Sequence, residues 1–241
     1  MTAHGATAAG LHEQLLEAIG ADLAAGELSP GMVLPIEALE ERYGVSRTVV
    51  REAVKVLQQL GIVTSRRRVG ISIQPSTQWE ALNPYVIRWR LAGPTRVAQL
   101  REISELRTGV EPVAASLAAR RATSQQCQTL VNAAGGMLVT GHRGDLQPYL
   151  EHDIVFHTTL LAASGNAAFA SLAPLVAEAL SGRTQHDLMP ARPLPEAMRW
   201  HREVADAIAA GDPRLAEEGM RCIVREAQEA TDPELASSHD S

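Results

Sequence analysis

The segment VSRTVVREAVKVLQQLG, residues 45–61, constrains the fold more than any other part of the chain. Its apolar residues recur at helical spacing: Val50, Val54 and Leu57. Such spacing is typical of a helix with one buried face. Gly44 precedes the segment and Gly61 ends it, and glycine is common where a helix closes. Ser46 is of the residue type preferred as an N-cap. The segment is therefore predicted to be a short amphipathic helix with well-defined ends.

The segments around this helix show a helical pattern before it and a strand pattern after it. Four apolar residues at helical spacing predict a first helix that ends near Gly26: Leu11, Leu15, Ile19 and Leu23. A second, short helix is expected over residues 37–43. Two β-prone runs follow, at residues 62–65 and 70–73. Three helices and a small hairpin are typical of a winged helix-turn-helix domain, which is predicted over residues 8–75.

The same region is strongly basic within an acidic chain. The formal net charge of the 241 residues is −6. Residues 42–75 contain one acid, Glu52, and seven basic residues: Arg42, Arg47, Arg51, Lys55, Arg66, Arg67 and Arg68. A local excess of positive charge on a helix-turn-helix favours binding to the phosphate backbone of double-stranded DNA.

Particular residues of this region are predicted to contact DNA. Arg47 and Arg51 are four residues apart, so they share one face of the helix, and arginine pairs bidentately with guanine in the major groove. Ser46 and Thr48, with the amides of the helix N-terminus, suit phosphate oxygens. The predicted wing tip adds three arginines: Arg66, Arg67 and Arg68. The alternative is a solvated basic face that binds nothing.

The rest of the chain is predicted to be a linker and a helical bundle. Residues 76–95 contain prolines and are expected to be a linker with a docked segment near residues 85–91. Residues 96–232 are helical in pattern almost throughout and are expected to form an all-α domain. After a first helix through residues 100–117, further helices are expected over about 123–138, 144–164, 167–183, 194–210 and 213–230. The predicted fold class is therefore mainly α.

Composition indicates where such a chain acts. It has no run of 18 apolar residues, and its first 10 residues lack both a basic start and an apolar core. A signal peptide or membrane span is therefore not expected. Two distant cysteines, Cys127 and Cys222, form no disulfide or zinc pattern, which favours the reducing cytoplasm.

Three residues of the C-terminal half are candidates for a metal site. Asp153 and His157 are four residues apart and would share a helix face, and His201 begins another amphipathic stretch. From these residues alone, an ordinary pair of surface side chains is the simpler interpretation.

The string LPIEALEERYGVSRTVVREAVKVLQQLGIV resembles the GntR family of transcription regulators, and the resemblance covers most of residues 11–73. It implies that Arg47, Thr48 and Arg51 act from the recognition helix and that Gly70 acts in the wing. The chain is one residue shorter than the family pattern before Tyr43. A phosphate-contacting arginine of many members is replaced near Ala38.

Three further motifs resemble the all-helical effector domain of the FadR-like branch of this family: LREISELRTGVEPVAASLAARRAT, D--FHTTLLAASGN and H----DAI--GD. The segment LNPYVIRWRLAG is similar to the linker of a galactonate-repressor-like subgroup. The resemblance implies that Asp153, His157 and His201 bind a divalent metal, for which zinc is predicted and nickel and manganese are alternatives. Ile223 occupies the place where a further histidine is usual.

The resemblance also indicates residues for a small-molecule effector. Arg107 matches an interior arginine that suits a ligand carboxylate, and its alternative is an internal salt bridge. Asn166 matches the SGN motif, and its alternative is a helix cap. Arg183 and His186 lie on a neighbouring stretch, and Arg183 is included in the predicted effector site.

These features predict a homodimeric, ligand-responsive transcription regulator rather than an enzyme. A small carboxylate such as a sugar acid would release it, as a repressor, from a roughly palindromic DNA operator. Two other functions compete with this one. The first is a metal-dependent hydrolase with an incidental basic segment. The second is an architectural protein that binds DNA without sequence preference.

Overall fold

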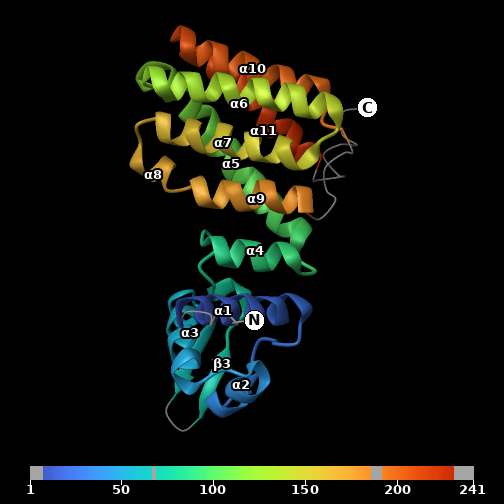
Figure 1. The fold of residues 1–241 in the computed structure, drawn as a ribbon. Helices are drawn as coiled ribbons and strands as arrows, with labels where there is room; N and C mark the ends of the chain where they lie inside the picture. The colour runs from blue at the N-terminus through green and yellow to red at the C-terminus, as the bar shows by residue number, and fades with distance from the viewer. Residues whose placement is uncertain (1–7, 67–68, 186–191, 231–241) are drawn as a thin grey trace, which may run out of the picture. The chain divides into compact units, whose positions relative to one another are not determined.

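The computed structural model of the chain describes residues 8–66, 69–185 and 192–230 (Figure 1). The chain divides into two compact units, Met1–Pro94 and Thr95–Ser241. No helix of the described residues is both long and apolar enough to cross a lipid bilayer.

The N-terminal unit is a winged helix-turn-helix, as predicted. Its first helices are α1 (Ala8–Ala25), α2 (Ile36–Tyr43) and α3 (Arg47–Gln59). Its strands are β1 (Val33–Leu34), β2 (Val63–Arg66) and β3 (Gly70–Ile73). They form one antiparallel sheet in the order β1-β3-β2. The hairpin of β2 and β3 was expected from its two β-prone runs, whereas the two-residue strand β1 was too short to leave a pattern.

The turn between α2 and α3 positions the recognition helix. Gly44 ends α2 with a φ of 64°, the left-handed backbone that glycine adopts without strain. Ser46 then begins α3 with an extended backbone, but its hydroxyl makes no capping hydrogen bond. The apolar face of α3 is buried in the core of the unit through Val50, Ala53, Val54 and Leu57. Burial of this face leaves the opposite, basic face of α3 exposed.

The segment expected to be a linker contains a helix that belongs to the N-terminal unit. After the short 3-10 helix η1 (Ser76–Gln78), α4 spans Pro84–Ala92 and begins at Asn83, whose side chain accepts a hydrogen bond from Tyr85 N. Trp89 of α4 is buried in the same core as α1 and packs directly over Gly20, where any side chain would overlap the indole ring. Residues 76–94 therefore include a packed helix, because the buried apolar side chains of α4 need a partner face.

The C-terminal unit consists of helices: α5 (Arg96–Arg121), α6 (Ser124–Arg143), α7 (Leu146–Ala163), α8 (Ala167–Ala170), α9 (Ala173–Gln185), α10 (Pro195–Ala210) and α11 (Pro213–Glu229). Helix α7 packs between α6 and α9 (Figure 1). Helix α10 packs against α6 and α11, and α5 contacts α7, α9, α10 and α11 from the centre. This arrangement confirms the predicted helical bundle and brings the buried faces of α5, α7 and α10 together.

Two helix boundaries differ from the sequence-based expectation. Helix α6 ends at Arg143, whereas the pattern placed its end near residue 138. Gly136 lies within α6 against the imidazole of His152 on α7, so its lack of a side chain permits close packing of the two helices. The helix expected over 167–183 is divided at residues 171–172 into α8 and α9.

Replacing the buried indole tests whether α4 is part of the N-terminal core. We expect Trp89→Ala to reduce the free energy of unfolding of this unit by about 3–5 kcal/mol, because the substitution removes a buried aromatic ring and leaves a cavity. Denaturant unfolding of the full chain measures the change. Leu82→Ala, at a side chain 58% exposed, is the control and should change stability by less than about 0.5 kcal/mol. Equal effects of the two substitutions would contradict the packing of α4.

Candidate functional site

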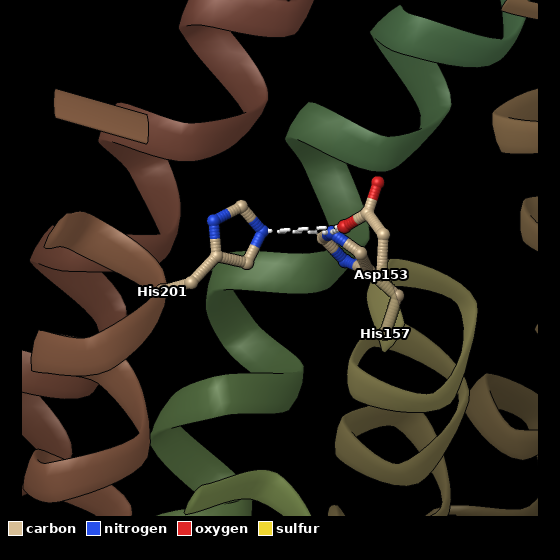
Figure 2. A group of neighbouring side chains, drawn as sticks. All are labelled: Asp153, His157 and His201. Carbon is tan, nitrogen blue, oxygen red and sulfur yellow. Dashed lines mark hydrogen bonds and ion pairs between the residues drawn. The ribbon is translucent and has the colours of Figure 1, made fainter. Parts of the chain in front are cut away.

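The candidate metal site lies between α7 and α10 in the C-terminal unit (Figure 2). Asp153 and His157 are one turn apart on the buried face of α7, and His201 is on the buried face of α10. Asp153 Oδ1 is 3.2 Å from His157 Nε2 and 3.4 Å from His201 Nε2. The two Nε2 atoms are 3.4 Å apart. The structure thus brings together all three residues that the sequence indicated as ligands.

Hydrogen bonds behind the two imidazoles determine which ring nitrogen faces this site. His157 Nδ1 lies 2.8 Å from Glu111 Oε2, and His201 Nδ1 lies 2.7 Å from the carbonyl oxygen of Ala197. Carboxylate and carbonyl oxygens only accept, so each Nδ1 carries the hydrogen and donates it. A neutral imidazole held in this way presents an unprotonated Nε2 to the site.

The residues present fit a divalent metal ion. Asp153 Oδ1 is buried and has no hydrogen-bond donor among the described residues. Two imidazole lone pairs and this carboxylate oxygen therefore face one another at close range. Buried acceptors arranged in this way are unfavourable unless a cation lies among them. Nitrogen and oxygen donors in this combination suit zinc and similar transition metals.

A buried ion network on α5 supports the site from behind. Arg107 Nε donates to Glu111 Oε1 at 2.7 Å, and Arg107 Nη2 lies 3.4 Å from both ring nitrogens of His157. Burial raises the pKa of the Glu111 carboxyl, but Arg107 and His157 outweigh burial and lower this pKa to about 2. Glu111 is therefore a carboxylate at neutral pH.

A small cavity lies beside the three candidate ligands. Its volume is about 30 Å³, which is room for one or two water molecules. Ile223 of α11 lines the cavity where the family resemblance places a further histidine. Besides Asp153 and the two histidines, the polar wall formed by the described residues includes Arg107, Tyr149, Arg183 and Glu226.

The structure brings two of the three residues predicted for the effector to this cavity. Arg107 lines the cavity. It also makes an internal ion pair with Glu111, which was the alternative to its predicted contact with the effector. Arg183 of α9 lines it and is 6% exposed. Asn166 is not among the wall residues, and its Oδ1 accepts a hydrogen bond from Ala168 N at the start of α8. Its capping role accounts for its place in the motif. His186 lies outside the described residues.

Sequence reasoning did not single out Glu111 or Glu226 as site residues. Glu111 follows Arg107 by four residues within the quoted motif, so the helical spacing alone could have paired them. Glu226 follows Ile223 by three residues on α11, and its approach to the cavity depends on how α11 packs against α5. No local pattern signals it.

The recognition helix presents the predicted DNA contacts at the surface. Ser46, Arg47, Thr48 and Arg51 are all exposed. Arg51 has no hydrogen-bond or ion-pair partner among the described residues. Arg47 Nη1 lies 2.7 Å from Glu37 Oε1 and 3.9 Å from Glu40 Oε1, both of α2. An exposed pair of this kind contributes little stability, so Glu37 leaves Arg47 accessible to a competing phosphate or base.

The wing residues have different surroundings. Arg66 is exposed at the end of β2. Gly70 has a φ of 116°, and any Cβ there would collide with the carbonyl oxygen of Leu34 in β1. This glycine is therefore required by the sheet itself, and its contact with DNA stays a prediction. Arg67 and Arg68 lie outside the described residues.

An exposed recognition helix in one unit and a buried polar site in the other define the class of DNA-binding regulators that respond to a small molecule. Residues 11–73 match the family described as bacterial regulatory proteins, gntR family, and residues 102–226 match the FCD domain. The chain therefore belongs to the GntR family and carries an FCD domain in its C-terminal unit.

Curated relatives agree with this assignment. The chain is 27% identical to the galactonate operon transcriptional repressor of Escherichia coli K12 over 88% of its own length and 93% of the relative's. It is 32% identical to the HTH-type transcriptional regulator YieP of the same organism, over 67% and 70% of the two lengths. Both relatives are named as transcriptional regulators, so the hydrolase interpretation is not supported.

A solved structure agrees in fold. The protein Lar, which controls the expression of the Listeria monocytogenes agr system, matches with a TM-score of 0.58. The match covers 92% of this chain and 96% of that one at 19% identity, which shows a shared fold.

Removing one member of the buried ion network tests its contribution to stability. We expect Glu111→Ala to destabilise the C-terminal unit by about 3–5 kcal/mol, because it leaves the buried Arg107 cation without its partner. Replacing both residues by apolar ones, as Arg107→Met with Glu111→Leu, should cost less because no unpaired charge remains. Denaturant unfolding monitored by circular dichroism compares them. A double variant as unstable as Glu111→Ala would contradict this explanation.

Proposed function

We propose that this protein is a cytoplasmic transcriptional repressor whose DNA binding is controlled by a small carboxylate that binds beside a divalent metal in the FCD domain. The convergence of Asp153, His157 and His201, with their Nε2 and Oδ1 atoms directed at one point, carries this proposal. The homodimer expected for the family would place two recognition helices on a roughly palindromic operator.

Zinc is the ion that we propose for this site, and nickel and manganese are the alternatives. Three protein ligands of mixed nitrogen and oxygen type leave at least one coordination position for water or another ligand. When bound, the metal supplies a Lewis-acidic position for an effector oxygen. Glu111 and the carbonyl oxygen of Ala197 would orient the two histidines toward it, as outer hydrogen bonds do in other metal sites.

The wall of the cavity supports a carboxylate as the effector. Arg183 is a buried cation whose Nε has no hydrogen-bond partner among the described residues. A planar guanidinium in such a position suits a carboxylate, which can accept two parallel hydrogen bonds. The name of one relative refers to a galactonate operon, which is consistent with a sugar acid as the effector. The carboxylate would replace the one or two water molecules for which the cavity has room.

Control of DNA binding follows from linkage. If the effector binds more tightly to a conformation with lower operator affinity, operator binding weakens by the same coupling free energy. In the competent conformation Arg51 and Arg47 would contact base edges while Ser46 and Thr48 contact phosphates. Glu37, which pairs with Arg47 in the free protein, would release it to the DNA.

Substitution of the recognition arginines tests the DNA contacts. We expect Arg47→Ala and Arg51→Ala each to weaken binding by about 1–3 kcal/mol and to relax specificity at one base pair, because each removes a bidentate contact. Fluorescence anisotropy on an operator selected from random DNA measures both effects. Arg214→Ala, an exposed arginine of α11, is the matched control. Unchanged affinity and specificity in both recognition variants would remove this assignment.

Loss of the carboxylate ligand tests the metal site and its link to the effector. We expect Asp153→Ala to copurify with little zinc and to lose its response to D-gluconate, while its basal DNA binding stays within twofold of wild type. Elemental analysis and anisotropy titration provide the two readouts. Glu151→Ala removes an exposed acid from the same helix and should change neither. A variant that retains wild-type zinc content would show that the ligands are elsewhere.

A further inference from the structure

Two oppositely charged residues face the cavity outside the candidate metal ligands. Arg183 comes from α9 and Glu226 from α11. Among the described residues, Arg183 has no hydrogen bond and no ion pair, although it is 6% exposed. Glu226 is partly buried at the same cavity. The two groups therefore influence each other by charge across the cavity rather than by direct contact.

The electrostatic environment of each group depends on the other. Burial lowers the pKa of the Arg183 guanidinium, and the Glu226 carboxylate opposes this more than any other charge. Burial raises the pKa of the Glu226 carboxyl, and the positive charge of Arg183 opposes this rise more than any other group does. The pKa of Glu226 is raised overall, and a divalent cation beside Asp153 would lower it and favour the ionised form.

The formal charge of the site limits the charge of its ligand. Among the described residues, the cavity and the ion pair behind it contain two cations and three carboxylates: Arg107, Arg183, Glu111, Asp153 and Glu226. With neutral histidines they leave one net negative charge. A divalent metal converts this to one net positive charge, which a single carboxylate group neutralises. A second carboxylate would leave an uncompensated negative charge in a buried site, and such charges are strongly unfavourable.

We propose that Glu226 makes the site selective for monocarboxylates over dicarboxylates by neutralising the charge of Arg183. This inference rests on the proposed metal-assisted carboxylate effector. Without Glu226, the same count with a divalent metal leaves two net positive charges, and the cavity would favour a dianion. Glu226 is therefore a specificity-determining residue, and Arg183 is the group on which it acts.

Two pairs of probes that differ in one carboxylate test this charge selection. Lactate and tartronate share a three-carbon skeleton, and D-gluconate and D-glucarate share a six-carbon skeleton. Isothermal titration calorimetry of the full-length, zinc-loaded protein, at a fixed free zinc concentration, gives the affinity ratio within each pair. We expect wild type to prefer the monocarboxylate in each pair that binds. Glu226→Gln should shift this ratio toward the dicarboxylate by at least about tenfold, which is about 1.4 kcal/mol.

Reciprocal variants separate charge from structure. Arg183→Gln removes one positive charge and should shift the ratio further toward the monocarboxylate. The double variant Glu226→Gln with Arg183→Gln keeps the net charge and should restore a ratio near that of wild type. A loss of packing would not be restored in this way. Glu218→Gln, which removes an exposed carboxylate from the same helix, is the control and should not change the ratio.

The outcomes distinguish this inference from the proposed function. If wild type binds a probe in a zinc-dependent way and neither Glu226→Gln nor the double variant behaves as expected, the role of Glu226 is wrong and the carboxylate effector stands. A wild-type preference for the dicarboxylate in both pairs would likewise show that the role of Glu226 is wrong, while the carboxylate effector stands. If none of the four probes binds the zinc-loaded protein, the carboxylate effector is contradicted, and the charge selection with it.

Discussion

The hydrogen bond between Glu111 and His157 is the interaction on which the rest of the site depends. It holds the hydrogen of the imidazole on Nδ1 and so directs an unprotonated Nε2 toward Asp153 and His201. Glu111 can remain ionised in the protein interior because Arg107 pairs with its other oxygen. The buried ion pair on α5 thus orients a histidine on α7. The cost of desolvating Glu111 is offset because its carboxylate pairs with Arg107 as well as with His157.

The two units use charge in opposite ways. On the recognition helix, Arg47 and Arg51 are exposed to solvent, and the ion pair of Arg47 with Glu37 can be exchanged for a phosphate at little cost. At the candidate site of the FCD domain, Arg107 and Arg183 are buried, so each needs a compensating anion whose position is fixed by packing. In the proposed function, the exposed arginines would bind a DNA operator and the buried cavity would select one small anion by its charge.

The sequence predicted the elements that have local signals and missed those that depend on packing. Gly44 and the apolar spacing of α3 predicted the recognition helix, because helix ends and buried faces depend on residues that are close together in the sequence. The end of α6 was placed near residue 138 instead of Arg143, and the role of Gly136 appears only where it meets His152. Asp153 and His157 could be paired from their spacing. Glu226 could not be placed, because its position at the cavity follows from the packing of α11 against α5.

The orientation of the two histidines is the most direct test of the account. Long-range ¹⁵N–¹H correlation spectra of the histidine side chains, recorded during zinc titration of the full chain, report the state of each ring nitrogen separately. We predict that zinc moves the Nε2 signals of His157 and His201 while both Nδ1 atoms remain protonated. Zinc binding through either Nδ1, or no change in either imidazole at saturating zinc, would contradict the central claim.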